Sequence, residues 1–229
     1  NGHEILDLGC GWGSFSLYVA EKYPDTKITS VSNSTDQITY INNEAQKRGL
    51  SNVNAYKMDV NNLELDTQFD RIVSIEMFEH LRNYKLILNS LNNLLKPDGR
   101  LFIHIFCHKK LTYFYEMKNN FDWMTKYFFQ GGIMPSKDIF EHFNDDLEII
   151  NQWDINGNNY SKTCKAWLDN HYENKKKILD IFQNHYDKPK IWFNRWRIFF
   201  LSCEAFFALN NGKEYFVAHY LLKKKSGRK

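Results

Sequence analysis

Three glycines alternate with other residues directly after an apolar run of strand length. Gly9, Gly11 and Gly13 follow the run at residues 4–8 and precede a helix-periodic segment. Glycines in this position let the chain turn tightly and bring its backbone close to a ligand at the carboxyl edge of a sheet. The G-x-G-x-G spacing differs from the G-x-G-x-x-G that supports a pyrophosphate. Asp7, just before the glycines, can pair with the cationic amino group of a methionyl moiety. The alternative is a strand-to-helix turn without a ligand, but such a turn seldom needs three glycines.

The next two apolar runs end in polar side chains at the same predicted edge. Asp59 follows the third run, where its carboxylate can accept a hydrogen bond from an adenine amino group; a turn-forming aspartate is the alternative. The second run lacks the terminal acid that holds ribose hydroxyls in dinucleotide sites. Asn33 and Gln37 would take that role through weaker, uncharged hydrogen bonds. Together with Asp7 and the glycine turn, these residues predict S-adenosylmethionine as the cofactor and methyl transfer as the chemistry.

The elements that must position these residues follow from the hydrophobic pattern. Strand-length apolar runs alternate with helix-periodic segments through residues 1–106, which predicts an α/β fold of the Rossmann-like methyltransferase type, with a mostly parallel seven-stranded sheet and helices on both faces. Strands are expected at residues 4–8, 27–32, 53–57, 69–75, 100–106, 147–156 and 215–222. Helices are expected at residues 14–22, 35–48, 84–95, 161–171, 175–186 and 192–210.

The chain is expected to form one catalytic domain over residues 1–229, with residues 1–106 as its cofactor-binding half. Beyond His108 the alternation stops, and residues 107–146 and 157–212 are expected to form inserted helical segments that cover the substrate. Turn-forming residues at 96–99 predict a tight bend before the fifth strand. The chain enters its first strand almost at once, so we expect that an N-terminal piece is missing.

Composition excludes few classes of protein. A formal net charge of +3 gives no argument for a nucleic-acid partner, and we expect none. The chain has no uncharged apolar run of membrane-spanning length, so no transmembrane segment is expected. Its cysteines lie far apart without zinc-ligand spacing, which predicts reduced thiols, no metal site and a cytoplasmic location. These residues are Cys10, Cys107, Cys164 and Cys203.

The chain resembles the methyltransferases related to cyclopropane-fatty-acyl-phospholipid synthase, which include the coclaurine N-methyltransferases. The likeness covers essentially the whole chain. Three motifs, SNSTDQ, IEMFEH and FCHK, are closer to the N-methyltransferase branch, since the lipid branch commonly has glycine where Arg82 and Cys107 stand. The similar segments are residues 5–17, 30–37, 74–84, 102–109, 127–136 and 196–224.

The resemblance implies a set of cofactor contacts and a further region of the protein. In this family a hydroxyl or amide motif commonly ends the second strand, so the missing acid is expected. An N-terminal region that helps to cap the cofactor is also implied. The implied contacts are Gly9, Gly11, Asn33, Gln37, Asp59 and Val60.

One hypothesis is an amine N-methyltransferase that acts on a small molecule. Glu79 and His80 would hold the substrate ammonium and accept its proton, because a protonated amine has no lone pair to attack a methyl group. General-base help of this kind is worth roughly a hundredfold to ten-thousandfold in rate. Glu76 would add negative charge. The simpler alternative is that Glu76 and His80, four residues apart at a helix start, form an ordinary surface pair.

A second hypothesis is cyclopropanation of an unsaturated phospholipid at a membrane surface. The resemblance implies a bound bicarbonate as the base, with ligands at Glu79, His104 and Tyr160 and a cysteine from the expected N-terminal region. Each residue also has a purely structural alternative. Tyr160 suits the first turn of a helix, and His104 could be a histidine within a strand whose hydrogen bonds are satisfied. The two hypotheses separate at His104: its loss should destroy cyclopropanation but only weaken N-methylation.

A third hypothesis, a binding module that has lost catalysis, is disfavoured by the intact Glu79 and His80. Aromatic residues in 113–129 and 192–207 could form a wall for a cationic sulfonium, although aromatic stripes at helical spacing are more often plain core. The sequence does not identify the acceptor molecule or the oligomeric state.

Overall fold

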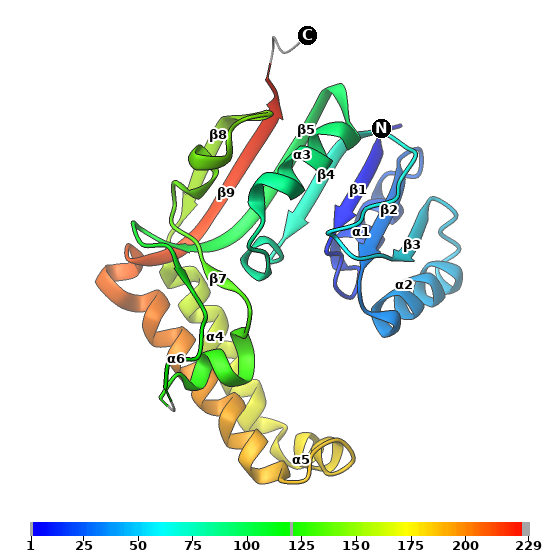
Figure 1. Cartoon of the computed structure of the whole chain (residues 1–229). Helices are drawn as coiled ribbons and strands as arrows, with labels where there is room; N and C mark the ends of the chain where they lie inside the picture. The colour runs from blue at the N-terminus through cyan, green and yellow to red at the C-terminus, as the bar shows by residue number, and fades with distance from the viewer. Residues whose placement is uncertain (1, 120, 226–229) are drawn as a thin grey trace.

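The computed structural model describes residues 2–119 and 121–225 of the chain. In this part of the chain, seven strands form one sheet in the order β3-β2-β1-β4-β5-β9-β8 (Figure 1). Neighbouring strands are parallel except at β9, which runs antiparallel to β5 and β8. The strands are β1 (Glu4–Leu8), β2 (Lys27–Ser32), β3 (Val53–Lys57), β4 (Phe69–Ile75), β5 (Leu95–His108), β8 (Leu147–Ile155) and β9 (Tyr215–Lys224).

Two hydrophobic cores lie on opposite faces of this sheet, and β1 contributes to both. Leu6 packs in a cluster with Leu91 of α3, whereas Ile5 packs in a second cluster with Leu17 of α1. This division follows from the alternation of side chains along a strand. The helices are α1 (Ser14–Lys22), α2 (Thr35–Lys47), α3 (Tyr84–Leu94), α4 (Gly157–Glu173), α5 (Lys175–Gln183) and α6 (Pro189–Gly212).

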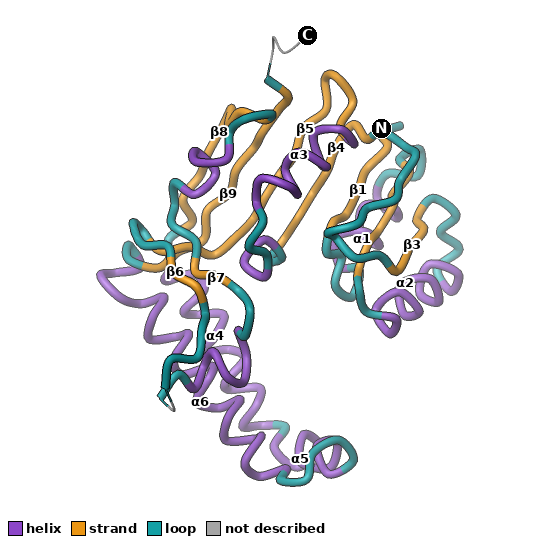
Figure 2. The backbone as a smooth tube through the Cα atoms, in the orientation of Figure 1, coloured by secondary structure: helices purple, strands orange, loops and turns teal. Residues whose placement is uncertain are grey.

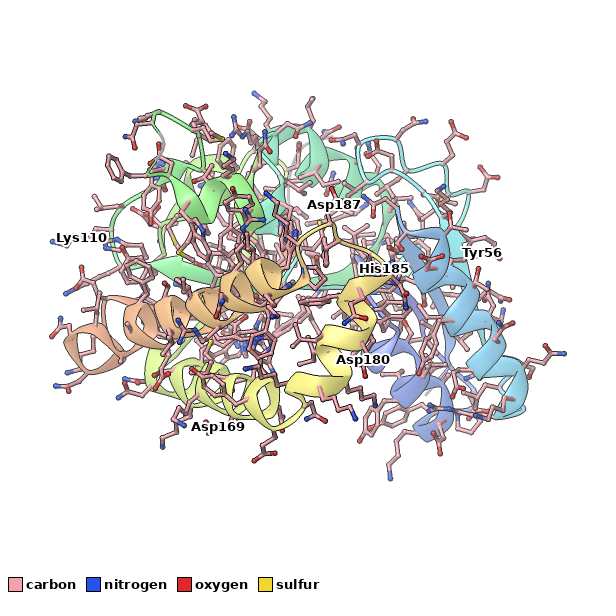
Figure 3. All side chains as sticks on the ribbon, turned by 90° about the horizontal axis from the view of Figure 1, so that it is seen from below. Tyr56, Lys110, Asp169, Asp180, His185 and Asp187 are labelled. Carbon is pink, nitrogen blue, oxygen red and sulfur yellow. The ribbon has the colours of Figure 1, made fainter. Side chains whose placement is uncertain are left out.

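The second half of the chain adds a helical arm below the carboxyl ends of β4 and β5. Helices α4 and α6 run side by side, and α5 with the turn at His185 joins their far ends (Figures 1 and 3). A third cluster, which includes Phe106 of β5, Cys164 of α4 and Phe207 of α6, joins the arm to the sheet. In the described ranges, no helix combines the length and apolar character needed to cross a membrane.

Residues 107–146 differ from the helical segment that the sequence predicted. After β5 the chain forms a two-stranded pair, β6 (Tyr113–Phe114) with β7 (Ile133–Met134), and two short helical turns joined by loops (Figure 2). The helical expectation for this segment is therefore wrong in the part that is described. Gly131, at a φ of 87°, and Pro135 interrupt any helix here. Tyr220 of β9 anchors the segment by donating a hydrogen bond to the Lys137 carbonyl.

The other predicted elements are present, with boundaries shifted by a few residues. The predicted fold class, a mostly parallel seven-stranded sheet with helices on both faces, is confirmed. The largest shifts are at α4, which begins at Gly157, and at β5, which begins at Leu95. The bend expected at residues 96–99 is an irregularity within β5, where the register to β4 shifts between Phe69 and Arg71.

We predict that Gly157→Ala destabilises the protein by roughly 1–3 kcal/mol, because overpacking against fixed atoms forces the backbone to move. A Cβ at Gly157 would overlap the Tyr215 carbonyl and lie 2.5 Å from the Phe207 carbonyl, where α4 meets α6 and β9. Urea unfolding measures the change. Asn159→Ala, on the exposed side of the same turn, is the matched control; equal effects of the two substitutions would contradict this account.

Candidate active site

The carboxyl ends of β1, β2 and β3 open on one cavity of about 400 Å³. Four of the predicted cofactor residues line it. They are Gly9, Asn33, Asp59 and Val60. The other four are not among the lining residues: Gly11 and Gly13 lie in the glycine turn, Asp7 in β1 and Gln37 in the first turn of α2.

Gly9 must be glycine for two reasons. Its φ is 80°, a conformation that L side chains rarely adopt, and a Cβ there would lie 2.5 Å from Cγ of Met77. Gly11, at a φ of 52°, has open space where a Cβ would stand. The turn thus presents bare backbone to the cavity, which fits the close approach of a ligand.

Asp7 lies beneath the turn and is almost completely buried, with 2% exposure. Its carboxyl accepts a 2.5 Å hydrogen bond from the Ser16 hydroxyl, which also contacts the Ser30 hydroxyl at 2.7 Å. Burial raises the pKa of Asp7 to about 6, against the lowering effect of the Ser16 hydrogen bonds. Asp7 therefore supports the glycine turn from below, and its predicted contact with a cofactor amino group stays a prediction.

The second-strand loop is held by hydroxyl and amide groups rather than by an acid. Ser32 donates a 2.6 Å hydrogen bond to Oε1 of Gln37, and Ser34 accepts one from the Gln37 backbone at the start of α2. Gln37 thus fixes the loop, while Asn33 lines the cavity. Across the cavity, Asp59 accepts hydrogen bonds from the backbone and side chain of Asn61.

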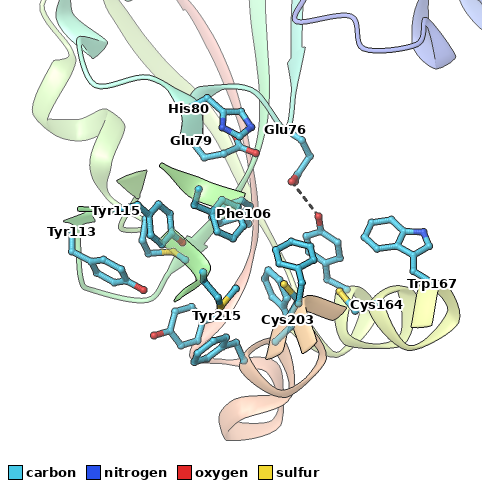
Figure 4. Close-up of a pocket in the computed structure, with 17 residues that line it drawn as sticks. Glu76, Glu79, His80, Phe106, Tyr113, Tyr115, Cys164, Trp167, Cys203 and Tyr215 are labelled. Carbon is cyan, nitrogen blue, oxygen red and sulfur yellow. Dashed lines mark hydrogen bonds between the residues drawn. The ribbon is translucent and has the colours of Figure 1, made fainter. Parts of the chain in front are cut away.

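A second cavity, of about 360 Å³, lies between the end of β4 and the helical arm. It is mostly apolar: aromatic rings, two methionines and two cysteines surround Glu76 and Glu79 (Figure 4). His80 lines both cavities and marks the place where they meet. Among the described residues that line the two cavities, none is Lys or Arg.

Glu76 stands directly after β4 in a left-handed conformation, with a φ of 53°. Its Oε2 accepts a 3.2 Å hydrogen bond from the Tyr160 hydroxyl (Figure 4), and its Oε1 lies 2.8 Å from Nε2 of His104. These contacts come from α4 and β5, on two sides of the carboxylate. Three residues that the sequence singled out separately therefore meet at one point.

Glu79 is the most deeply buried carboxyl group of the cavity, with 2% exposure. Burial raises its pKa well above the ordinary value, and the negative charge of Glu76 raises it further. Its Oε2 is buried without a hydrogen-bond partner. Such a group is costly to keep in a folded protein, so Glu79 is poised to take up a proton or to face a cation.

Two histidines complete the surroundings of these carboxyl groups. Partial burial lowers the pKa of His80, while the charge of Glu76 acts in the opposite direction. His104 contacts a residue that sequence reasoning missed: its Nδ1 lies 2.9 Å from Nε2 of His219 on β9. Burial lowers the pKa of His219, and the neighbouring His104 lowers it further.

The aromatic stripes of the sequence divide into two groups. One group lines the cavity: Tyr113, Tyr115, Phe129, Phe199, Phe206 and Phe207. The other group packs away from it, as in the edge-on contact of Tyr127 with Trp192 at a ring separation of 5.9 Å. The cavity-wall interpretation therefore holds for the first group of rings, and the core interpretation holds for the second.

Comparison with known proteins agrees with this geometry. The family model for mycolic acid cyclopropane synthetase matches residues 1–215. The (S)-coclaurine N-methyltransferase of Thalictrum flavum subsp. glaucum is 39% identical over 98% of this chain and 64% of its own length. The cyclopropane-fatty-acyl-phospholipid synthase of Escherichia coli strain K12 is 31% identical over 82% of this chain and 47% of its own length.

The fold has a close counterpart among solved structures. A crystal structure of coclaurine N-methyltransferase bound to N-methylheliamine and S-adenosylhomocysteine (SAH) superposes with a TM-score of 0.92 and 38% identity, over 97% of this chain and 66% of that one. The sheet and its helices are therefore those of the Rossmann-like S-adenosylmethionine-dependent methyltransferases. The chain belongs to the mycolic acid cyclopropane synthetase family. It spans somewhat less than two thirds of the length of the coclaurine N-methyltransferase of Thalictrum.

We predict that Asp7→Asn stabilises the protein at pH 8 by on the order of 1–3 kcal/mol. A carboxyl group with a raised pKa favours folding while it is protonated, and this contribution is lost as the pH rises through about 6. Asparagine carries no charge at any pH, so the gain should shrink at pH 5. Urea unfolding at the two pH values measures it; a loss of stability at pH 8 would show that the ionised carboxylate is needed.

Proposed function

We propose that this chain is the catalytic part of an S-adenosylmethionine-dependent N-methyltransferase whose acceptor is a small-molecule amine. The observation that carries the proposal is the pair Glu76 and Glu79, which faces a mostly apolar cavity with no Lys or Arg among its described lining residues. Two carboxyl groups in such a place favour a cationic guest, because no positive charge of the protein compensates them. A substrate ammonium supplies that charge.

S-adenosylmethionine would bind in the cavity above the glycine turn, consistent with the SAH bound to the coclaurine N-methyltransferase. Gly9 would let its backbone approach the cofactor, Asn33 would face the ribose, and Asp59 with Val60 the adenine. When bound, the cofactor supplies a sulfonium methyl group that a nucleophile can displace in line. The meeting of the two cavities at His80 is where such a methyl group would face the acceptor.

Glu79 is the proposed general base. Its carboxylate would accept the proton of the bound ammonium and so free the nitrogen lone pair, while Glu76 balances the positive charge. His80 would hold the substrate nitrogen at the border of the two cavities. Aromatic rings exclude water and face the cation, as suits a sulfonium and an ammonium.

The remaining parts of the chain have roles that fit this proposal. Residues 1–106 would form the cofactor-binding half of a single domain, and residues 107–146 and 157–212 would cover the substrate, since both contribute to the cavity lining. We also propose a cytoplasmic location, because Cys10, Cys107, Cys164 and Cys203 are all free thiols.

The proposal predicts where the methyl group goes. The purified protein should transfer label from methyl-labelled S-adenosylmethionine to nitrogen when it is offered secondary and tertiary amines that carry aromatic rings. Unsaturated phospholipid vesicles, offered in parallel, should stay unlabelled. Mass spectrometry locates the label; a labelled ring in the acyl chain, with no labelled amine, would refute the proposal in favour of the lipid reaction.

Glu79→Gln should reduce kcat/KM for the amine by at least about a hundredfold, the loss expected when a general base is removed. In the unaltered enzyme, kcat/KM should rise with pH through an acid limb above the ordinary range of glutamate, because the raised pKa of Glu79 delays formation of its carboxylate. The variant should lose that limb.

Calorimetric binding of S-adenosylmethionine is the control for this variant and should be unchanged, since Glu79 does not line the cofactor cavity. Retention of the acid limb in Glu79→Gln would assign the base to another group.

A further inference from the structure

The three positions that the family resemblance implies for holding bicarbonate do not leave room for it here. Two of them contact the side chain of Glu76: Tyr160 donates a 3.2 Å hydrogen bond to it, and Nε2 of His104 lies 2.8 Å from it. The third, Glu79, lines the same cavity as Glu76. The space between these groups is therefore filled by a carboxylate that belongs to the chain itself.

The backbone at Glu76 shows how the carboxylate reaches this place. The residue follows the last residue of β4, and its N–H donates a 3.0 Å hydrogen bond to the His104 carbonyl of β5. Its φ of 53° is uncommon for any residue other than glycine. Strained conformations of this kind persist only where the surroundings enforce them, and they cluster at functional sites.

The contact of His104 with His219 is consistent with an anion at this point, although Oε1 of Glu76 makes no hydrogen bond of good geometry. A neutral His104 ring with its proton on Nε2, the nitrogen beside Glu76, must accept at Nδ1. Nε2 of His219, 2.9 Å away, then has to be the donor. In that form Nε2 of His104 carries an N–H 2.8 Å from Oε1 of Glu76, and Tyr160 donates its O–H to the other carboxylate oxygen (Figure 4).

We infer that Glu76 is a built-in anion, which occupies the site where His104 and Tyr160 would otherwise hold an external carboxylate such as bicarbonate. The reaction of this protein is then independent of bicarbonate. Only the activity measurements below rest on the proposed N-methyltransferase function; the binding measurement stands without it.

Glu76→Gly tests the inference directly, because glycine accepts the left-handed backbone and leaves both donors in place. By isothermal titration calorimetry and by ¹³C NMR of labelled bicarbonate, this variant should bind bicarbonate or formate. The unaltered protein and Glu76→Gln, whose amide fills the same space, should bind neither. Adding Tyr160→Phe to Glu76→Gly should weaken the binding at least severalfold.

In the activity assay, Glu76→Gly should lose more than tenfold in kcat/KM and regain most of it with added bicarbonate. Glu76→Gln should lose activity without being rescued. Circular dichroism confirms that each variant is folded. Absence of anion binding by folded Glu76→Gly, or stimulation of the unaltered enzyme by bicarbonate, would overturn the inference. Failure of the unaltered protein to methylate any amine would instead reject the proposed function, while the binding result still decides the role of Glu76.

Discussion

This site is organised around two carboxyl groups in one mostly apolar cavity, with no Lys or Arg among its described lining residues. Glu79 is buried with an unpaired oxygen, and the charge of Glu76 makes its ionisation harder still. Such an arrangement costs folding free energy, so it persists only because other contacts hold it. His104 and Tyr160 supply those contacts for Glu76, and the rigid end of β4 fixes both carboxyl groups relative to the cofactor cavity.

The parallel sheet explains why the two cavities meet. The carboxyl ends of β1, β2, β3 and β4 lie at one edge of the sheet, so the glycine turn, the second-strand loop and the carboxyl pair come together although they are separated in sequence. The antiparallel strand β9 places His219 beside His104. The helical arm then closes the cavity with aromatic rings, which keep water from the carboxyl groups and strengthen their attraction to a cation.

Local patterns predicted much of this arrangement, and long-range register explains the rest. The glycine turn and the motif around Glu79 were visible because their chemistry lies within a few residues. The contact of His104 with His219 depends on how two antiparallel strands 115 residues apart align, which no local pattern specifies. Residues 107–146 are rich in aromatics without a helical period, so their irregular path is set by tertiary contacts such as that of Tyr220 with Lys137.

The division of labour between the two glutamates follows from their different surroundings. Each glutamate keeps one buried oxygen without a hydrogen-bond partner. Glu76 accepts a hydrogen bond from Tyr160 and lies 2.8 Å from His104, whereas Glu79 is the more deeply buried of the two and gains most from a cation or a proton. In the proposed reaction, a substrate ammonium would first supply a positive charge beside the carboxyl groups and would then give its proton to Glu79. An uncharged acyl chain would provide neither and would leave the carboxyl pair uncompensated. Under the proposed function, the electrostatic imbalance that makes the empty cavity unfavourable would also select a cationic substrate.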